Sequence, residues 1–141
     1  MIELHIPLDP VPWAAPKISK RYAYDVRESE KRCVRYFIKQ QYQKDLITDY
    51  VALQFKFVFK PPLSHSKKKR CEMLEGKIIP TKCDCTNLQK LYEDCLKGIV
   101  IDDDRKVAKI FSEKVYGEKE GIFIRILTLK EYQDANLIRE S

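Results

Sequence analysis

The residues with the clearest chemical potential lie within positions 81–107, where carboxylates flank a helix-like pattern. Asp84 stands before that pattern, and an acidic turn of Asp102, Asp103 and Asp104 stands just after it. Three adjacent carboxylates repel one another by about 1 kcal/mol per close pair even in water, so a cation would relieve them. Oxygen ligands without clustered histidines suit magnesium or manganese. We therefore predict one metal site that Asp84 shares with the acidic turn.

A helix is predicted between these two groups of acids. Asp84 can cap its start, because an Asp side chain accepts free amide protons of the first turn, and Gly98 can end it in the left-handed conformation. The polar face carries Asn87, Lys90 and Asp94, a pattern that a solvated helix surface shows equally well. The predicted buried face, with spacings of three and four, comprises Leu88, Leu91, Tyr92, Cys95 and Leu96.

This stretch resembles the signature of the RusA-type crossover-junction endodeoxyribonucleases, the Holliday junction resolvases whose core reads Lys-Pro-Asp-x-Asp-Asn-Leu-x-Lys. Positions 62–76 also resemble a Ser-Lys-Lys-Lys-Arg loop common in that family. Two positions depart from the signature, because Cys83 replaces the usual Pro and Thr86 replaces the usual second carboxylate. The matching positions are Lys82, Asp84, Asn87, Leu88, Lys90, Asp94, Gly98 and the Asp-Asp-x-x-Val of 103–107.

The resemblance implies a metal-dependent nuclease that resolves four-way DNA junctions in recombination and repair. Asp84 and Asp104, with Asp103 as a helper, are then expected to hold Mg²⁺, with Mn²⁺ as a possible substitute. Thr86 can offer a hydroxyl ligand but no charge. Lys90 is expected to stabilise charge on the phosphate or the leaving oxygen. A homodimer is also expected, because cutting two opposed strands calls for two sites related by a two-fold axis.

Cationic residues form the predicted DNA-binding surface, and the net charge of +6 favours a polyanionic partner. One group lies in a proline-rich loop at 8–24, where cations can neutralise phosphates and Trp13 can stack on a base. That loop could equally be a connector whose Trp13 packs into the core. A second group, four consecutive cations, could instead be a solvated cluster. The predicted contacts are Lys17, Lys20, Arg21, Lys67, Lys68, Lys69, Arg70, Lys82 and Asn87.

Length and periodicity predict one α+β domain over residues 1–141. Strands are expected at 2–6, 51–59, 107–116 and 122–129, because apolar residues alternate there or form short bounded runs. A helix with a cationic outer face that includes Lys31 is predicted after Asp25, with a capping-box-like start. A short helix is expected to end at Gly76. The order is then strand, helix, strand, short helix, helix, strand, strand, with helices packed on a mixed four-stranded sheet.

Other protein classes are less consistent with the sequence. Five cysteines without a secretory signal favour reduced thiols in the cytoplasm, and the apolar runs are far shorter than the roughly 18 residues of a membrane span. No serine lies in a nucleophile-elbow glycine pattern. Two alternatives stay open: a branched-DNA-binding module weakened by Thr86, and a basic RNA-binding protein. A zinc site would lack paired C-x2-4-C knuckles and would use His65, Cys71, Cys83 and Cys85.

Overall fold

The computed structural model describes residues 1–140, with side chains for residues 1–135. Its centre is a four-stranded sheet in the order β1-β6-β4-β5, in which β4 pairs antiparallel with β6 and parallel with β5. The mixed α+β architecture predicted from the sequence is confirmed. The strands of this sheet are β1 (Ile2–Ile6), β4 (Val51–Phe59), β5 (Val107–Tyr116) and β6 (Gly121–Thr128).

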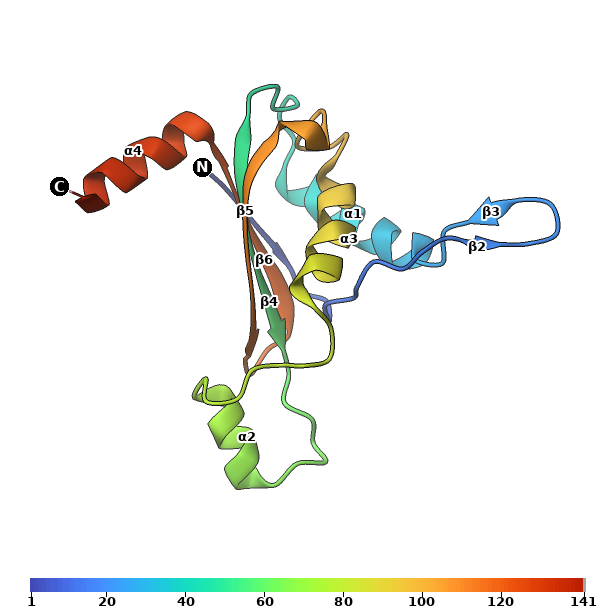
Figure 1. The fold of residues 1–141 in the computed structure, drawn as a ribbon, viewed down its shortest axis with the longest axis vertical. Helices are drawn as coiled ribbons and strands as arrows, with labels where there is room; N and C mark the ends of the chain where they lie inside the picture. Colours follow the sequence, from blue (N-terminus) through green and yellow to red (C-terminus); the bar gives the residue numbers. More distant parts are fainter. Residues whose placement is uncertain (141) are drawn as a thin grey trace.

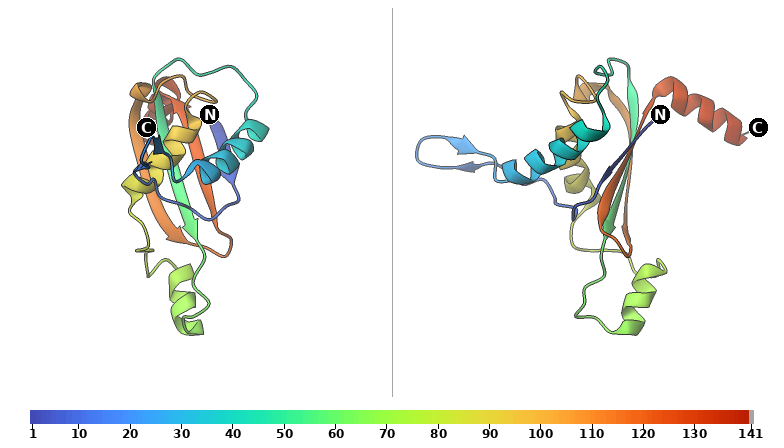
Figure 2. Two further views of the ribbon diagram at one scale, coloured as in Figure 1. Left: turned by 90° about the vertical axis from the view of Figure 1, so that its right-hand side faces the viewer. Right: turned by 180° about the vertical axis from the view of Figure 1, so that it is seen from behind.

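Helices cover mainly one face of the sheet (Figure 1). On that face, α1 (Glu28–Gln41) packs against α3 and β1, and α3 (Cys85–Leu96) packs beside β5. Helix α2 (Lys67–Leu74) lies beyond one end of the sheet, and α4 (Leu129–Glu140) extends away on the opposite side from α1 and α3 (Figures 1 and 2). Most of the other face is therefore left without a helical cover.

The core lies between the sheet and the pair α1 and α3. Strand β4 is the central element, since Phe55 and Phe57 are no more than 1 % exposed and stack with ring centroids 5.7 Å apart. Tyr92 of α3 packs against Phe57, and its hydroxyl accepts a hydrogen bond from the amide of Val11 at 2.9 Å. Burial raises the pKa of the Tyr92 hydroxyl, which stays neutral. This packing fixes α3 on the sheet.

The carboxylate-flanked helix forms as predicted. The side chain of Asp84 caps α3 by accepting the amide of Asn87 at 2.8 Å. Gly98 follows the helix with φ of +85°, a conformation that glycine adopts without steric cost. The five residues of the predicted apolar stripe are all buried.

Two local predictions are wrong. Asp25 does not cap α1: the N-cap residue is Arg27, and Asp25 pairs instead with Lys31 at 2.7 Å. Lys31 was expected on the exposed cationic face but is only 8 % exposed, because it also reaches Asp94 of α3 at 3.7 Å. The Lys31 side chain thus joins the two helices by ion pairs, and its hydrogen bond lowers the pKa of Asp25.

The predicted loop at 8–24 contains an additional hairpin. Strands β2 (Lys17–Ile18) and β3 (Ala23–Tyr24) pair antiparallel and project away from the sheet on the side of α1 (Figure 1). All five cysteines are free. Among the helices of the described chain, none combines the length and the apolar character needed to cross a bilayer.

Candidate functional site

Asp84 lies at the edge of an open hollow of about 640 Å³ at the start of α3. Its carboxylate is exposed, and among the described residues it forms no ion pair, so oxygen lone pairs remain free for a ligand. Thr86, two residues further along the chain, is also exposed on the first turn of the helix. The residues that line the hollow are Pro12, Trp13, Thr81, Lys82, Cys83, Asp84, Asn87 and Lys114.

The loop before the hairpin forms one wall of this hollow. The amide of Trp13 donates to the carbonyl of Asn87 at 2.9 Å, and the half-buried indole packs against the core. The Lys90 ammonium lies 3.5 Å from the centre of the Trp13 ring, a cation–π contact. Trp13 thus packs against the core, as the connector interpretation predicted, and DNA contact by the loop cations stays a prediction. Its contact with Lys90 also restrains the cation that was expected to face phosphate.

Lys114 is a site cation that sequence reasoning missed. It extends from β5 and donates to the carbonyl of Cys83 at 2.6 Å, directly before Asp84. Nothing in the local pattern of β5 distinguishes Lys114 from any other strand lysine. Only the packing of α3 beside β5, which also joins Ser112 to Gln89 at 2.6 Å, places it at the hollow.

The acidic turn follows α3 and is largely neutralised by its own cations. Asp103 accepts hydrogen bonds from the Arg105 guanidinium at 2.8 and 3.0 Å, which lower the pKa of the Asp103 carboxyl. Asp102 pairs with Lys106 at 3.0 Å, but its Oδ1 is buried and has no hydrogen-bond partner among the described residues. Asp104 begins the short helix η1 (Asp104–Lys106), is exposed, and among the described residues forms one ion pair, with Lys97 at 3.9 Å. Asp104 is therefore the freest carboxylate of the turn.

Glu93 is a second residue that sequence reasoning missed. Burial raises the pKa of its carboxyl, and the nearby charges of Asp104 and Asp94 raise it further. Functional sites often contain a carboxyl group whose pKa is raised by burial and by a neighbouring carboxylate. Its spacing of four residues from Gln89 puts the two on one helix face, but only the structure shows that Gln89 contacts β5.

The structure does not bring the predicted metal ligands together within one chain. Asp84 caps the start of α3 and Asp104 follows its end, so the two lie at opposite ends of a 12-residue helix that is about 18 Å long. Figure 1 shows the start of α3 on the side of α2 and η1 at the other end. Two oxygens bound to one Mg²⁺ lie within about 4 Å of each other. Asp84 and Asp104 of the same chain therefore cannot bind one Mg²⁺ together in this structure, and the predicted shared site stays a prediction.

The described residues contain no group of three or more His, Cys, Asp or Glu side chains that could hold a metal ion. This finding rules out the zinc alternative within the described chain. The donor chemistry still suits magnesium, because Asp84 and Asp104 are exposed oxygen ligands and the buried Oδ1 of Asp102 lacks a partner. One chain has suitable ligands at two places, but no complete site.

Seven of the predicted DNA-contacting cations fall into two groups, and all seven except the half-buried Arg70 are exposed. Lys17, Lys20 and Arg21 lie on the β2–β3 hairpin, where no acidic residue accompanies them. The cations at 67–70 form the first turn of α2, which Ser66 caps by accepting the amide of Lys69. Lys82 lines the Asp84 hollow and lies 3.9 Å from Asp9.

Comparison with known proteins gives one result. Residues 7–127 match the family described as endodeoxyribonuclease RusA, and this range includes both Asp84 and the acidic turn. No curated protein matches the chain. Since the match spans most of the sequence, the chain belongs to the RusA family of endodeoxyribonucleases.

Proposed function

We propose that this protein is a magnesium-dependent endonuclease that resolves Holliday junctions in DNA recombination and repair. The observation that carries the proposal is the exposed hollow at the start of α3, where the family's first motif carboxylate, Asp84, lies among three cations. Lys82 and Lys114 line this hollow, and Lys90 stands on the same helix against Trp13. A carboxylate among cations can bind a metal while the cations hold the phosphate.

The metal ligands proposed are Asp84 and Asp104, with Asp103 and Thr86 as helpers. When bound there, Mg²⁺ would polarise the phosphate and lower the pKa of a water molecule. Asp103 is already held by Arg105, so its role is to orient the turn more than to bind directly. Lys90, restrained by Trp13, would stabilise charge that develops on the phosphate or the leaving oxygen.

We further propose that the protein works as a homodimer in which each site combines Asp84 of one copy with Asp104 of the other. The support is the separation of these residues along α3, which a second copy in the opposite direction would overcome. Two such sites arise together under a two-fold axis. They would suit the two opposed strands that resolution of a four-way junction must cut.

Basic surfaces around Asp84 would bind the junction arms. The cations at 67–70 stand in the first turn of α2, where the positive end of the helix dipole disfavours further positive charge. A DNA phosphate would relieve this repulsion. The β2–β3 hairpin, which carries the other cations, projects from the segment that continues past Trp13, and these cations would contact a second stretch of backbone.

The proposal is tested by incubating the protein with a synthetic four-way junction, with and without Mg²⁺, beside a linear duplex of the same sequence. Metal-dependent, paired cuts in the junction alone are the expected result. If the protein binds the junction but does not cut it at any Mg²⁺ or Mn²⁺ concentration, the binding-module alternative is established. In that alternative the site is inactive because Thr86 replaces the usual carboxylate. Preference for RNA over the junction would contradict both.

A further inference from the structure

Strand β5 is an open edge of the sheet. It is last in the order β1-β6-β4-β5, so one side of its ten-residue backbone has no strand partner in the described chain. Ile110 and Phe111 in its middle are 39 % and 62 % exposed. A long edge strand with exposed apolar side chains readily pairs with another strand.

We propose that β5 of a second copy pairs antiparallel with this edge, about a two-fold axis at Phe111, to give one continuous eight-stranded sheet. The axis must be perpendicular to the sheet, and it therefore relates each residue to one on the same face. Side chains alternate between the two faces along a strand, so the axis must pass beside a residue and not between two residues. If the pairing register shifted by one residue, side chains of opposite faces would be paired. Few registers are thus available.

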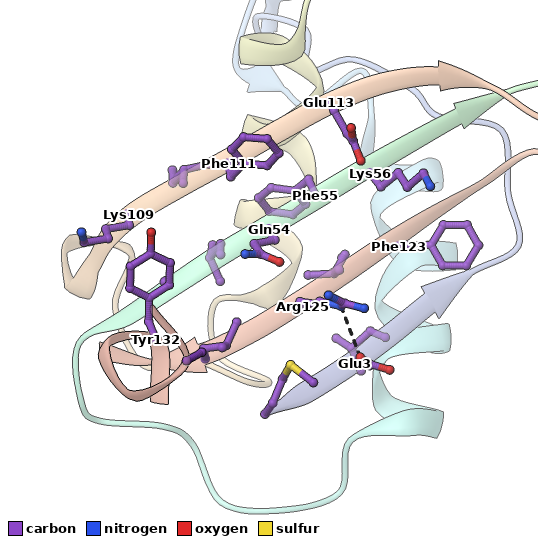
Figure 3. Close-up of a pocket in the computed structure, with 18 of the residues that line it drawn as sticks. Glu3, Gln54, Phe55, Lys56, Lys109, Phe111, Glu113, Phe123, Arg125 and Tyr132 are labelled. Atoms are coloured by element: carbon purple, nitrogen blue, oxygen red, sulfur yellow. Dashed lines mark ion pairs between the residues drawn. The ribbon is translucent and has the colours of Figure 1, made fainter. Parts of the chain in front are cut away.

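The charges on β5 favour the register centred on Phe111. Lys109, Phe111 and Glu113 lie on the same open face of the strand, as Figure 3 shows. With the axis at Phe111, each Lys109 lies opposite the Glu113 of the second copy, and the two Phe111 rings meet. Centring on Lys109 or on Glu113 would place two like charges opposite each other, which destabilises a strand pair. Centring on Ile110 or Ser112 would leave both Lys109 and Glu113 without an opposite charge across the axis.

The same register brings together the two halves of the proposed site. The contacts of Lys114 with Cys83 and of Ser112 with Gln89 show that α3 runs antiparallel beside β5, with Asp84 level with Lys114. Across the axis, Lys114 faces Ala108 of the second copy, which lies near the start of its β5. The acidic turn directly precedes that start. Asp104 of the second copy therefore lies near the start of α3 of the first copy, where Asp84 is.

This inference rests on the proposed homodimer and names its interface. The test is a charge exchange across the axis, read by light scattering after size exclusion and by sedimentation. Lys109→Glu places two pairs of glutamates opposite each other and should weaken the dimer at least about tenfold. The double variant Lys109→Glu with Glu113→Lys restores opposite charges and should recover dimerisation. The matched control is Lys119→Glu, the same change of charge in the turn after β5, and it should leave the dimer intact.

The double variant also serves as a folding control. It contains Lys109→Glu, so if it dimerises, that substitution does not prevent the chain from folding. A monomeric wild type, or equal dimerisation by Lys109→Glu and wild type, would overturn the interface, as would a double variant that stays monomeric. If the wild type cleaves junctions and Lys109→Glu does not weaken dimerisation, this interface is refuted but the proposed function is not. Recovery by the double variant without cleavage under any metal condition would support the interface and refute the proposed function.

Discussion

Subunit mixing provides the strongest test of a site that two copies share. Asp84→Asn and Asp104→Asn each remove one charged ligand from both sites of a dimer, so each homodimer should lose activity. The loss should exceed the roughly 100-fold that an outer-shell metal partner can cost. In a heterodimer of the two variants, one site loses both ligands and the other retains both. That heterodimer should therefore cut DNA.

The structure supports these substitutions as mild ones. Asn caps a helix as well as Asp does, so Asp84→Asn retains the bond to the Asn87 amide, whereas Asp84→Ala would cost about 0.5–2 kcal/mol of stability. The one ion pair of Asp104 among the described residues is with Lys97, at 3.9 Å on the exposed surface, and such a pair contributes less than about 1 kcal/mol. Melting temperatures close to that of the wild type would confirm that both variants fold.

The assay uses two affinity tags to isolate the heterodimer and follows a labelled four-way junction under single-turnover conditions. With one intact site of two, the heterodimer should make the first nick at about half the wild-type rate. It should accumulate nicked junctions without the paired cut that resolves them. Asp84 and Asp104 of one chain lie at opposite ends of α3, which is about 18 Å long, so an intrachain site cannot account for rescue.

A reciprocal heterodimer provides the control. When wild type is paired with a chain that carries both substitutions, every shared site loses one ligand, so this heterodimer should be inactive. A site within one chain predicts the reverse, because the wild-type subunit would then be complete. Activity of the reciprocal heterodimer and inactivity of the mixed single variants would refute the shared site.

Three further predictions concern single features of the chain. Alanine at all four positions of 67–70 should flatten the salt dependence of junction binding by about 0.9 log units for each phosphate that these cations neutralise in the wild type; an unchanged slope would identify a merely solvated cluster. Thr86→Asp should lower the Mg²⁺ concentration for half-maximal cleavage, since it adds a charged ligand on the first turn of α3; an unchanged titration would place Thr86 away from the metal. Glu93→Gln should raise the melting temperature at pH 7 but not at pH 4. The pKa of Glu93 is raised in the folded protein, so its charged form, which prevails at pH 7, destabilises the fold, whereas its protonated form does not. An equal gain in melting temperature at both pH values would contradict this cause.

The sequence by itself determined the elements that carry the site. Asp84 and Gly98 bounded α3 correctly, because capping and the left-handed turn depend on neighbouring backbone alone. Strand β5 was also predicted with its observed bounds, 107–116. The family resemblance rested on the same local spacing, and the match over residues 7–127 confirmed it.

Only the tertiary structure decided which of these residues lie near one another. A helix pattern shows which face is polar but not what faces it, so Lys31 was misplaced on the surface and Lys114 was overlooked. The acids at the two ends of α3 are close in the sequence, yet the rise of a helix keeps them apart. Whether a strand is central or at an edge depends on pairings between distant segments, and it is this order that leaves β5 open.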